Sequence, residues 1–181
     1  WHILGNHLFA NAKALMFAGF FFDNVESKKW LNKGLRIITE EFEEQVLQDG
    51  GHFELSPMYH SIFVEDVLDL INLCRTFPDI NLKLDLKRFT ETASTMMLWL
   101  NDMCHPDDEI SFFNDAAIGI APSPAEIRSY STRLNITRLD KSYSKKKLLI
   151  KHYPDSGYMQ LSTPKAKIFL DVSAIGPNYL P

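Results

Sequence analysis

Apolar residues recur at helical spacing along most of the chain before residue 140, and this pattern predicts five helices. The expected helices span about residues 4–22, 27–47, 57–77, 85–104 and 123–134, with an irregular stretch at 105–122. Apolar side chains surround nearly all of the first helix, so we expect it to be buried on more than one side. The second helix carries a continuous polar face, so we expect it to be buried along one side only, with Ser27 as its N-cap.

After Lys141 the pattern changes to short β-rich runs, separated by turn sequences at 154–157 and 163–164. These runs predict three antiparallel strands, and the expected fold class is therefore mainly α with a β tail. Short links between helices favour antiparallel hairpins in two layers, as in a layered helical barrel. We place a domain boundary near residue 140, between a helical part, 1–140, and the start of an all-β part, 141–181.

The composition excludes several classes of partner. The chain has 181 residues, an apolar share of 45% and a net charge of −4, without a basic stripe, so we expect no nucleic-acid partner. A local cluster of side chains could still bind an acidic polysaccharide. No apolar run approaches the roughly 18 residues that a membrane-spanning helix needs, so we expect no membrane insertion. Cys74 and Cys104 lie in apolar helical patterns and are expected to be buried thiols, with a disulfide left open.

Residues 49–60, DGGHFELSPMYH, hold the densest group of chemically useful side chains in the chain. Ser56 is a good N-cap and Pro57 suits the first helical position, which puts Tyr59 in the first helical turn. Backbone N–H groups without helical partners lie there, at the positive end of the helix dipole, which makes Tyr59 a plausible proton carrier. The competing interpretation is an ordinary half-buried tyrosine. The same segment supplies three further candidates, His52, Glu54 and His60.

The first helix carries a second polar group on an otherwise apolar surface. His7 and Asn11 are four residues apart and share a narrow stripe, and Asn6 lies about 100° from His7. A histidine on an apolar helix is more often a satisfied core residue than a catalytic one. However, two inner helices of a barrel would be neighbours, and their polar residues would then face one cavity. We therefore expect Asn6, His7 and Tyr59 to share a site.

Other chemistries match the sequence less well. His52, His60 and Glu54 could bind zinc, but no HExxH or cysteine-pair spacing is present, so we expect no metal site. The sequence contains no GxSxG motif, so nothing in it indicates a serine nucleophile. A glycoside hydrolase would need two carboxylates across a cleft. Glu54 could be one and Asp115 the other, although no feature of the sequence places Asp115 opposite.

Two long motifs, GNHLFANAKAL at 5–15 and DGGHFELSPMYH at 49–60, resemble the heparinase II/III-like polysaccharide lyases. The FND motif at 113–115 and GPNYLP at 176–181 fit the same family, so the resemblance covers almost the whole chain. It implies an α/α-toroid, here its C-terminal part at 1–140, followed by the first strands of an antiparallel β-sandwich. It also implies cleavage of uronate-containing polysaccharides, such as heparan sulfate or alginate, by β-elimination.

The resemblance also implies roles for particular residues. Asn6 and His7 would hold the uronate carboxylate, and Tyr59 would serve as general base, as general acid, or as both. The remaining candidates would orient Tyr59 or bind the substrate's sugar hydroxyls: His52, Glu54, His60 and Asn11.

Family members usually carry a further catalytic histidine in the sandwich, soon after a GPxYLP stretch, and some carry a zinc ion there. Because this chain starts at Trp1 in mid-pattern and stops at Pro181, we interpret it as an internal fragment that is inactive alone, without a cofactor of its own. A periplasmic or extracellular location is implied by the family alone. A non-catalytic carbohydrate-binding homologue and a toroidal glycoside hydrolase are the alternatives.

Overall fold

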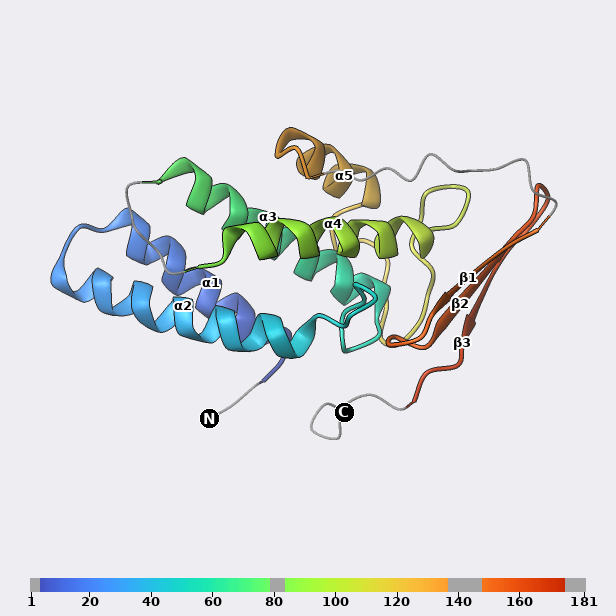
Figure 1. The fold of residues 1–181 in the computed structure, drawn as a ribbon, viewed down its shortest axis with the longest axis horizontal. Coiled ribbons are helices and arrows are strands. Elements are labelled where there is room, and N and C mark those ends of the chain that lie inside the picture. Colours follow the sequence, from blue (N-terminus) through green and yellow to red (C-terminus); the bar gives the residue numbers. More distant parts are fainter. Residues whose placement is uncertain (1–3, 79–83, 137–147, 175–181) are drawn as a thin grey trace.

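The computed structural model describes residues 4–78, 84–136 and 148–174. Helices occupy most of the described chain, and a small sheet lies at one end of them (Figure 1). This arrangement confirms the expected fold class of a mainly α protein with a β tail. The elements are α1 (Asn6–Phe21), α2 (Val25–Gln45), α3 (Pro57–Thr76), α4 (Leu86–Asp102), α5 (Pro124–Arg133), β1 (Leu149–Tyr153), β2 (Tyr158–Ser162) and β3 (Lys167–Asp171).

The predicted cap of the second helix is wrong by three residues. Asn24 is the N-cap of α2, and its side chain accepts a hydrogen bond from the Ser27 N–H at 2.8 Å. The Ser27 hydroxyl lies 3.1 Å from the Asn24 N–H, and the two residues therefore form a reciprocal capping box. Asn is as good an N-cap as Ser, and the reciprocal pair sets the start of the helix at Asn24.

Burial of the first helix also differs from the prediction. In the described chain, α1 is buried along one stripe, formed by Phe9, Ala12, Met16 and Gly19. Phe17 and Phe21 lie on the uncovered side, and Phe21 is 82% exposed. The helix that is buried on nearly all sides is α3, which packs against α1, α4 and α5. Overall hydrophobicity alone therefore does not identify the central helix.

Close packing joins α1 to α2 as an antiparallel hairpin. Two glycines permit it: a Cβ at Gly19 would lie 2.7 Å from the Cβ of Leu31, and a Cβ at Gly34 would lie 2.9 Å from the Ala12 carbonyl oxygen. Each glycine thus lets the opposite helix approach its backbone directly. The hairpin is held mainly by this contact and by the core residues that line it.

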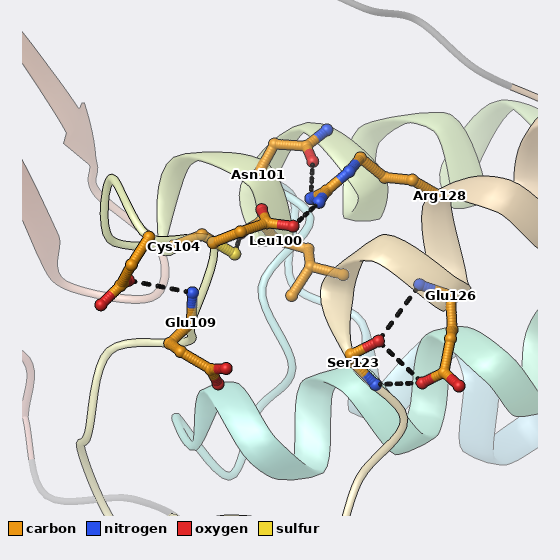
Figure 2. A network of polar contacts seen from close by, with 9 residues as sticks. Leu100, Asn101, Cys104, Glu109, Ser123, Glu126 and Arg128 are labelled. Carbon is orange, nitrogen blue, oxygen red and sulfur yellow. Dashed lines mark hydrogen bonds and ion pairs between the residues drawn. The ribbon is translucent and has the colours of Figure 1, made fainter.

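Helix α5 is fixed to the end of α4 by polar contacts (Figure 2). The Arg128 guanidinium donates to the Asn101 side chain at 3.1 Å and forms an ion pair with Asp108. Helix α5 begins where it was predicted to begin: Ser123 and Glu126 form a capping box, and Pro124 takes the first helical position. These contacts hold the loop between α4 and α5 close to the helices.

The predicted antiparallel strands are confirmed, in the order β1-β2-β3. Tyr158 and Gln160 on the inner face of β2 are buried against the helices. At the same interface the Trp99 indole donates to the Ser156 hydroxyl at 3.0 Å, and Lys151 pairs with Asp102 at 2.6 Å. The outer face is apolar and exposed; it includes Ile150, Ile168, Leu170 and Val172.

Candidate functional site

The segment before α3 folds as the sequence predicts. Ser56 is the N-cap of α3 and accepts from the Tyr59 N–H at 3.5 Å, while Pro57 occupies the first turn. Tyr59 is partly buried and packs against the core. The start of the segment is a tight turn at Gly50, where φ is +90° and a Cβ would lie 2.8 Å from the Thr95 carbonyl group. Glycine is therefore required there to bring the segment against α4.

Helices α1 and α3 run parallel, with their first turns at the same end. Their contacts follow the same order along both helices. Phe9 meets Phe63 with ring centroids 4.3 Å apart, Lys13 pairs with Asp69 at 2.9 Å, and Phe20 meets Phe77 at 5.5 Å. Residues of α1 thus lie level with residues of α3 that are 54–57 positions later. By this offset, the Asn6–His7 turn lies level with the turn that carries Tyr59.

Glu54 joins the two helix starts. Its carboxylate accepts from the Asn6 backbone N–H at 3.4 Å, at the positive end of α1, where Gly5 provides no side-chain cap. Burial raises the pKa of Glu54, the Asn6 N–H and nearby His7 lower it, and Asp115 raises it. The structure therefore brings Asn6, His7 and Glu54 together.

The loop after α4 supplies a part of the site that the sequence did not place. Asn114 and Asp115 both have positive φ, +44° and +57°, and Asp115 lies close enough to Glu54 to affect its titration. The Asn114 amide donates to the Leu55 carbonyl at 3.0 Å. Asn and Asp tolerate this left-handed backbone better than most residues, so the Asn-Asp pair was the available signal for a sharp turn.

His52 and His60 are enclosed in the core, with no exposed surface. The His52 Nε2 lies 3.1 Å from the Gln45 side-chain oxygen, and the His60 Nε2 lies 3.0 Å from the Met96 carbonyl oxygen. Burial lowers the pKa of both, that of His60 to about 4, so both rings are neutral at physiological pH. This position suits support of the segment rather than direct contact with a sugar.

His7 and Asn11 lie one turn apart on one face of α1, as predicted, and that face is exposed. Asn6 is partly buried at the helix start. Of the seven candidates, Asn6, His7 and Asn11 from α1 and Glu54 and Tyr59 from the second segment therefore retain access to solvent, whereas His52 and His60 have none. Within the described residues, no three His, Cys, Asp or Glu side chains are arranged to bind a metal ion.

Replacing His60 with Gln should reduce the pH dependence of stability. Because the folded state keeps this imidazole neutral while an unfolded histidine takes up a proton below about pH 6.5, stability falls as the pH decreases towards about 4. Between about pH 7.5 and about pH 5, His60 should account for about 2 kcal/mol of that loss. Urea unfolding of both proteins at the two pH values would measure the difference. An equal pH dependence in both proteins would contradict this assignment.

The Cys74 and Cys104 thiols are free, Cys104 is buried and Cys74 partly so. Burial raises the pKa of both, to about 11 for Cys74 and about 12 for Cys104, so neither is a ready nucleophile.

Across the three described ranges, no helix has the length and apolar character needed to cross a membrane.

Two known proteins are similar to this chain in sequence. Heparin-sulfate lyase of Bacteroides stercoris is 31% identical over 121 residues, and heparin-sulfate lyase of Pedobacter heparinus is 30% identical over 121 residues. Each match covers 63% of this chain and 17% of the relative. The chain thus spans about a sixth of the length of these relatives.

Solved structures share the fold. The chain superposes on heparan sulfate lyase HepC from Pedobacter heparinus with a TM-score of 0.64 and 22% identity. A heparinase III structure gives a TM-score of 0.63 and 23% identity. Both superpositions cover 88% of this chain and 26% of the solved chain. The family model for the heparinase II/III N-terminus matches residues 1–136, and the chain therefore belongs to the heparinase II/III family.

Proposed function

We propose that the complete gene product is a polysaccharide lyase that cleaves uronate-containing glycans by β-elimination. The named relatives act on heparin sulfate, which supports an acidic polysaccharide as substrate. The observation that carries the proposal is the parallel course of α1 and α3, since it sets the Asn6–His7 turn level with Tyr59.

Asn6 and His7 would bind the uronate carboxylate. β-Elimination removes the proton at C5, next to that carboxylate, and expels the oxygen at C4. The negative charge that develops passes into the carboxylate, so the barrier falls when preorganised donors neutralise it. The Asn6 amide and the His7 imidazole are suitable donors, and both belong to the first turn of α1, whose dipole also favours negative charge.

Tyr59 would transfer the proton. A phenolate can accept the C5 proton, and the resulting phenol can then donate it to the leaving oxygen at C4 if both lie on the same side of the sugar ring. Glu54 would hold the two helix starts together through the Asn6 N–H. Asn11 would bind a sugar hydroxyl further along α1, and His52 and His60 would support the segment from the core.

The domain organisation and the location of the proposed enzyme are inferred from the family. We infer that residues 1–140 belong to an α/α-toroid and that residues 141–181 begin a β-sandwich. The exposed apolar face of the sheet supports the second inference, since a sandwich buries such a face against another sheet. The sandwich histidine and any zinc ion would lie outside the described residues. We also infer a periplasmic or extracellular location.

A screen of polymers tests the proposal. The complete gene product should be incubated with heparan sulfate, alginate and other uronate polymers while ultraviolet absorbance is recorded. Lyase action forms a 4,5-unsaturated uronate, so absorbance and new reducing ends should increase together. Binding of a polymer without either signal would favour a non-catalytic carbohydrate-binding protein.

One observation favours hydrolysis as the second candidate function. Asp115 lies close enough to Glu54 to raise its pKa, and a general acid in a glycoside hydrolase needs a raised pKa. In that case new reducing ends would form without absorbance, and Glu54→Gln would abolish their formation. Burial is the larger cause of the Glu54 shift, however, and the bond to Asn6 gives this carboxylate a structural role.

A further inference from the structure

The residue that follows Glu54 has an unusual backbone. Leu55 has a φ of +58°, in the left-handed region that leucine rarely adopts, and its side chain is buried. Its N–H donates to the His52 carbonyl oxygen at 2.9 Å, which closes a tight turn immediately before the cap of α3. Such a conformation persists only where surrounding contacts hold it.

The contacts that hold it come from outside the segment. The Tyr158 hydroxyl donates to the Leu55 carbonyl oxygen at 2.5 Å, and the Asn114 amide donates to the same oxygen at 3.0 Å. Tyr158 has no exposed surface, and burial raises its pKa, so the hydroxyl remains a donor at neutral pH. Two donors therefore bind the carbonyl oxygen of this left-handed residue, which has room for two.

The hairpin formed by β1 and β2 also holds the other end of the segment, at Asp49. One Asp49 carboxylate oxygen accepts from the Asp155 N–H at 3.1 Å, the Ser156 N–H at 2.7 Å and the Ser156 hydroxyl at 2.9 Å. The turn between β1 and β2 thus binds Asp49, and the first residue of β2 binds Leu55. The segment that carries Glu54 is fixed at both ends by the sheet.

We propose that Tyr158 is a positioning residue, whose hydroxyl fixes the Leu55 turn and so keeps Glu54 and Tyr59 level with the start of α1. This role rests on the proposed function, because it is for β-elimination that Tyr59 must meet Asn6 and His7. It gives the β tail a task in a site whose candidate side chains all lie in the helical part.

Tyr158→Phe and Tyr153→Phe in the complete gene product form a matched pair for the test. Both remove a hydroxyl from the inner face of the sheet and keep the ring, but the Tyr153 hydroxyl donates to the Asp102 carboxylate at the end of α4. Amide hydrogen exchange of residues 52–59 measures the turn directly. Steady-state kinetics on the polymer that the wild type cleaves best measures how a change in the turn affects kcat and KM.

Tyr158→Phe should speed exchange in residues 52–59 by about tenfold or more, while Tyr153→Phe should leave it near the wild-type rate. In an active lyase, Tyr158→Phe should lower kcat about 10- to 100-fold with KM within about twofold, because misplacement of the reacting groups costs rate more than binding. A purely structural loss would instead reduce the active fraction, and a titration of active sites would reveal it.

Unchanged exchange in Tyr158→Phe, or equal effects of the two variants on exchange, would overturn the proposal. So would faster exchange with an unchanged kcat. If the wild type cleaves no polymer by elimination, the proposed function fails, and the exchange result alone then supports or overturns the fixing of the turn by Tyr158.

Discussion

Tyr59→Phe should lower kcat for elimination about 10²- to 10⁴-fold, the range that a single acid–base group contributes. The substitution removes one oxygen atom and keeps the ring, which packs against the core at the start of α3. The fold and KM should therefore change little, and the loss should lie in the chemical step. Absorbance kinetics on the polymer that the wild type cleaves best would measure it.

Tyr130→Phe is the matched control for this experiment. The Tyr130 hydroxyl donates to Asp69 at 3.0 Å, in the second half of α3, away from the first turns of α1 and α3. This variant should keep kcat within about twofold of the wild type. If Tyr59→Phe also keeps most of the wild-type kcat, Tyr59 does not transfer the proton.

Trp99→Ala should produce the largest loss of stability, about 3–5 kcal/mol. Trp99 is fully buried in α4, where its ring lies 4.4 Å from His60 and 5.7 Å from Tyr158 between centroids. Its indole N–H also donates to Ser156, so the substitution both leaves a cavity and removes a bond between helix and sheet. Chemical denaturation would measure the change in the free energy of unfolding.

Trp30→Ala serves as the comparison for that measurement. Trp30 lies on α2, is partly exposed, and makes an edge contact with Phe22 at 6.1 Å. Trp30→Ala should lower the free energy of unfolding clearly less than Trp99→Ala does. Less apolar surface is lost from the core, and the substitution leaves no enclosed cavity. Equal losses of stability for the two variants would contradict the inference that Trp99 joins α4 to the sheet.

Local signals in the sequence carried the prediction of the helices and strands. Ser56 followed by Pro57, and Ser123 followed by Pro124, fixed two helix starts because caps and first-turn prolines act within a few residues. The start of α2 was predicted three residues too late, at Ser27, because Asn24 is an equally competent cap and the reciprocal bonds that favour it are visible only in the structure. Strand positions followed from alternation and from the turn at 154–157.

Contacts between distant parts of the chain were not predictable in this way. No feature of the sequence placed Asp115 near Glu54, because that approach depends on the left-handed backbone at Asn114 and Asp115. The burial of His52 was equally hidden, since polar residues in a short loop usually face solvent. The burial of His60 in α3 depends on its contact with Met96 in α4, 36 residues later in the chain. The role of Tyr158 was not predictable from the sequence, because its partner, Leu55, is 103 residues away and contributes only a carbonyl group.

The most direct test of the central claim is the mass of the products from a defined heparan-sulfate oligosaccharide cut once by the complete gene product. Elimination adds nothing to the substrate, so the masses of the two products should sum to the substrate mass, and one product should carry the unsaturated uronate. Hydrolysis adds water, and a product sum that exceeds the substrate mass by one water molecule would contradict the account.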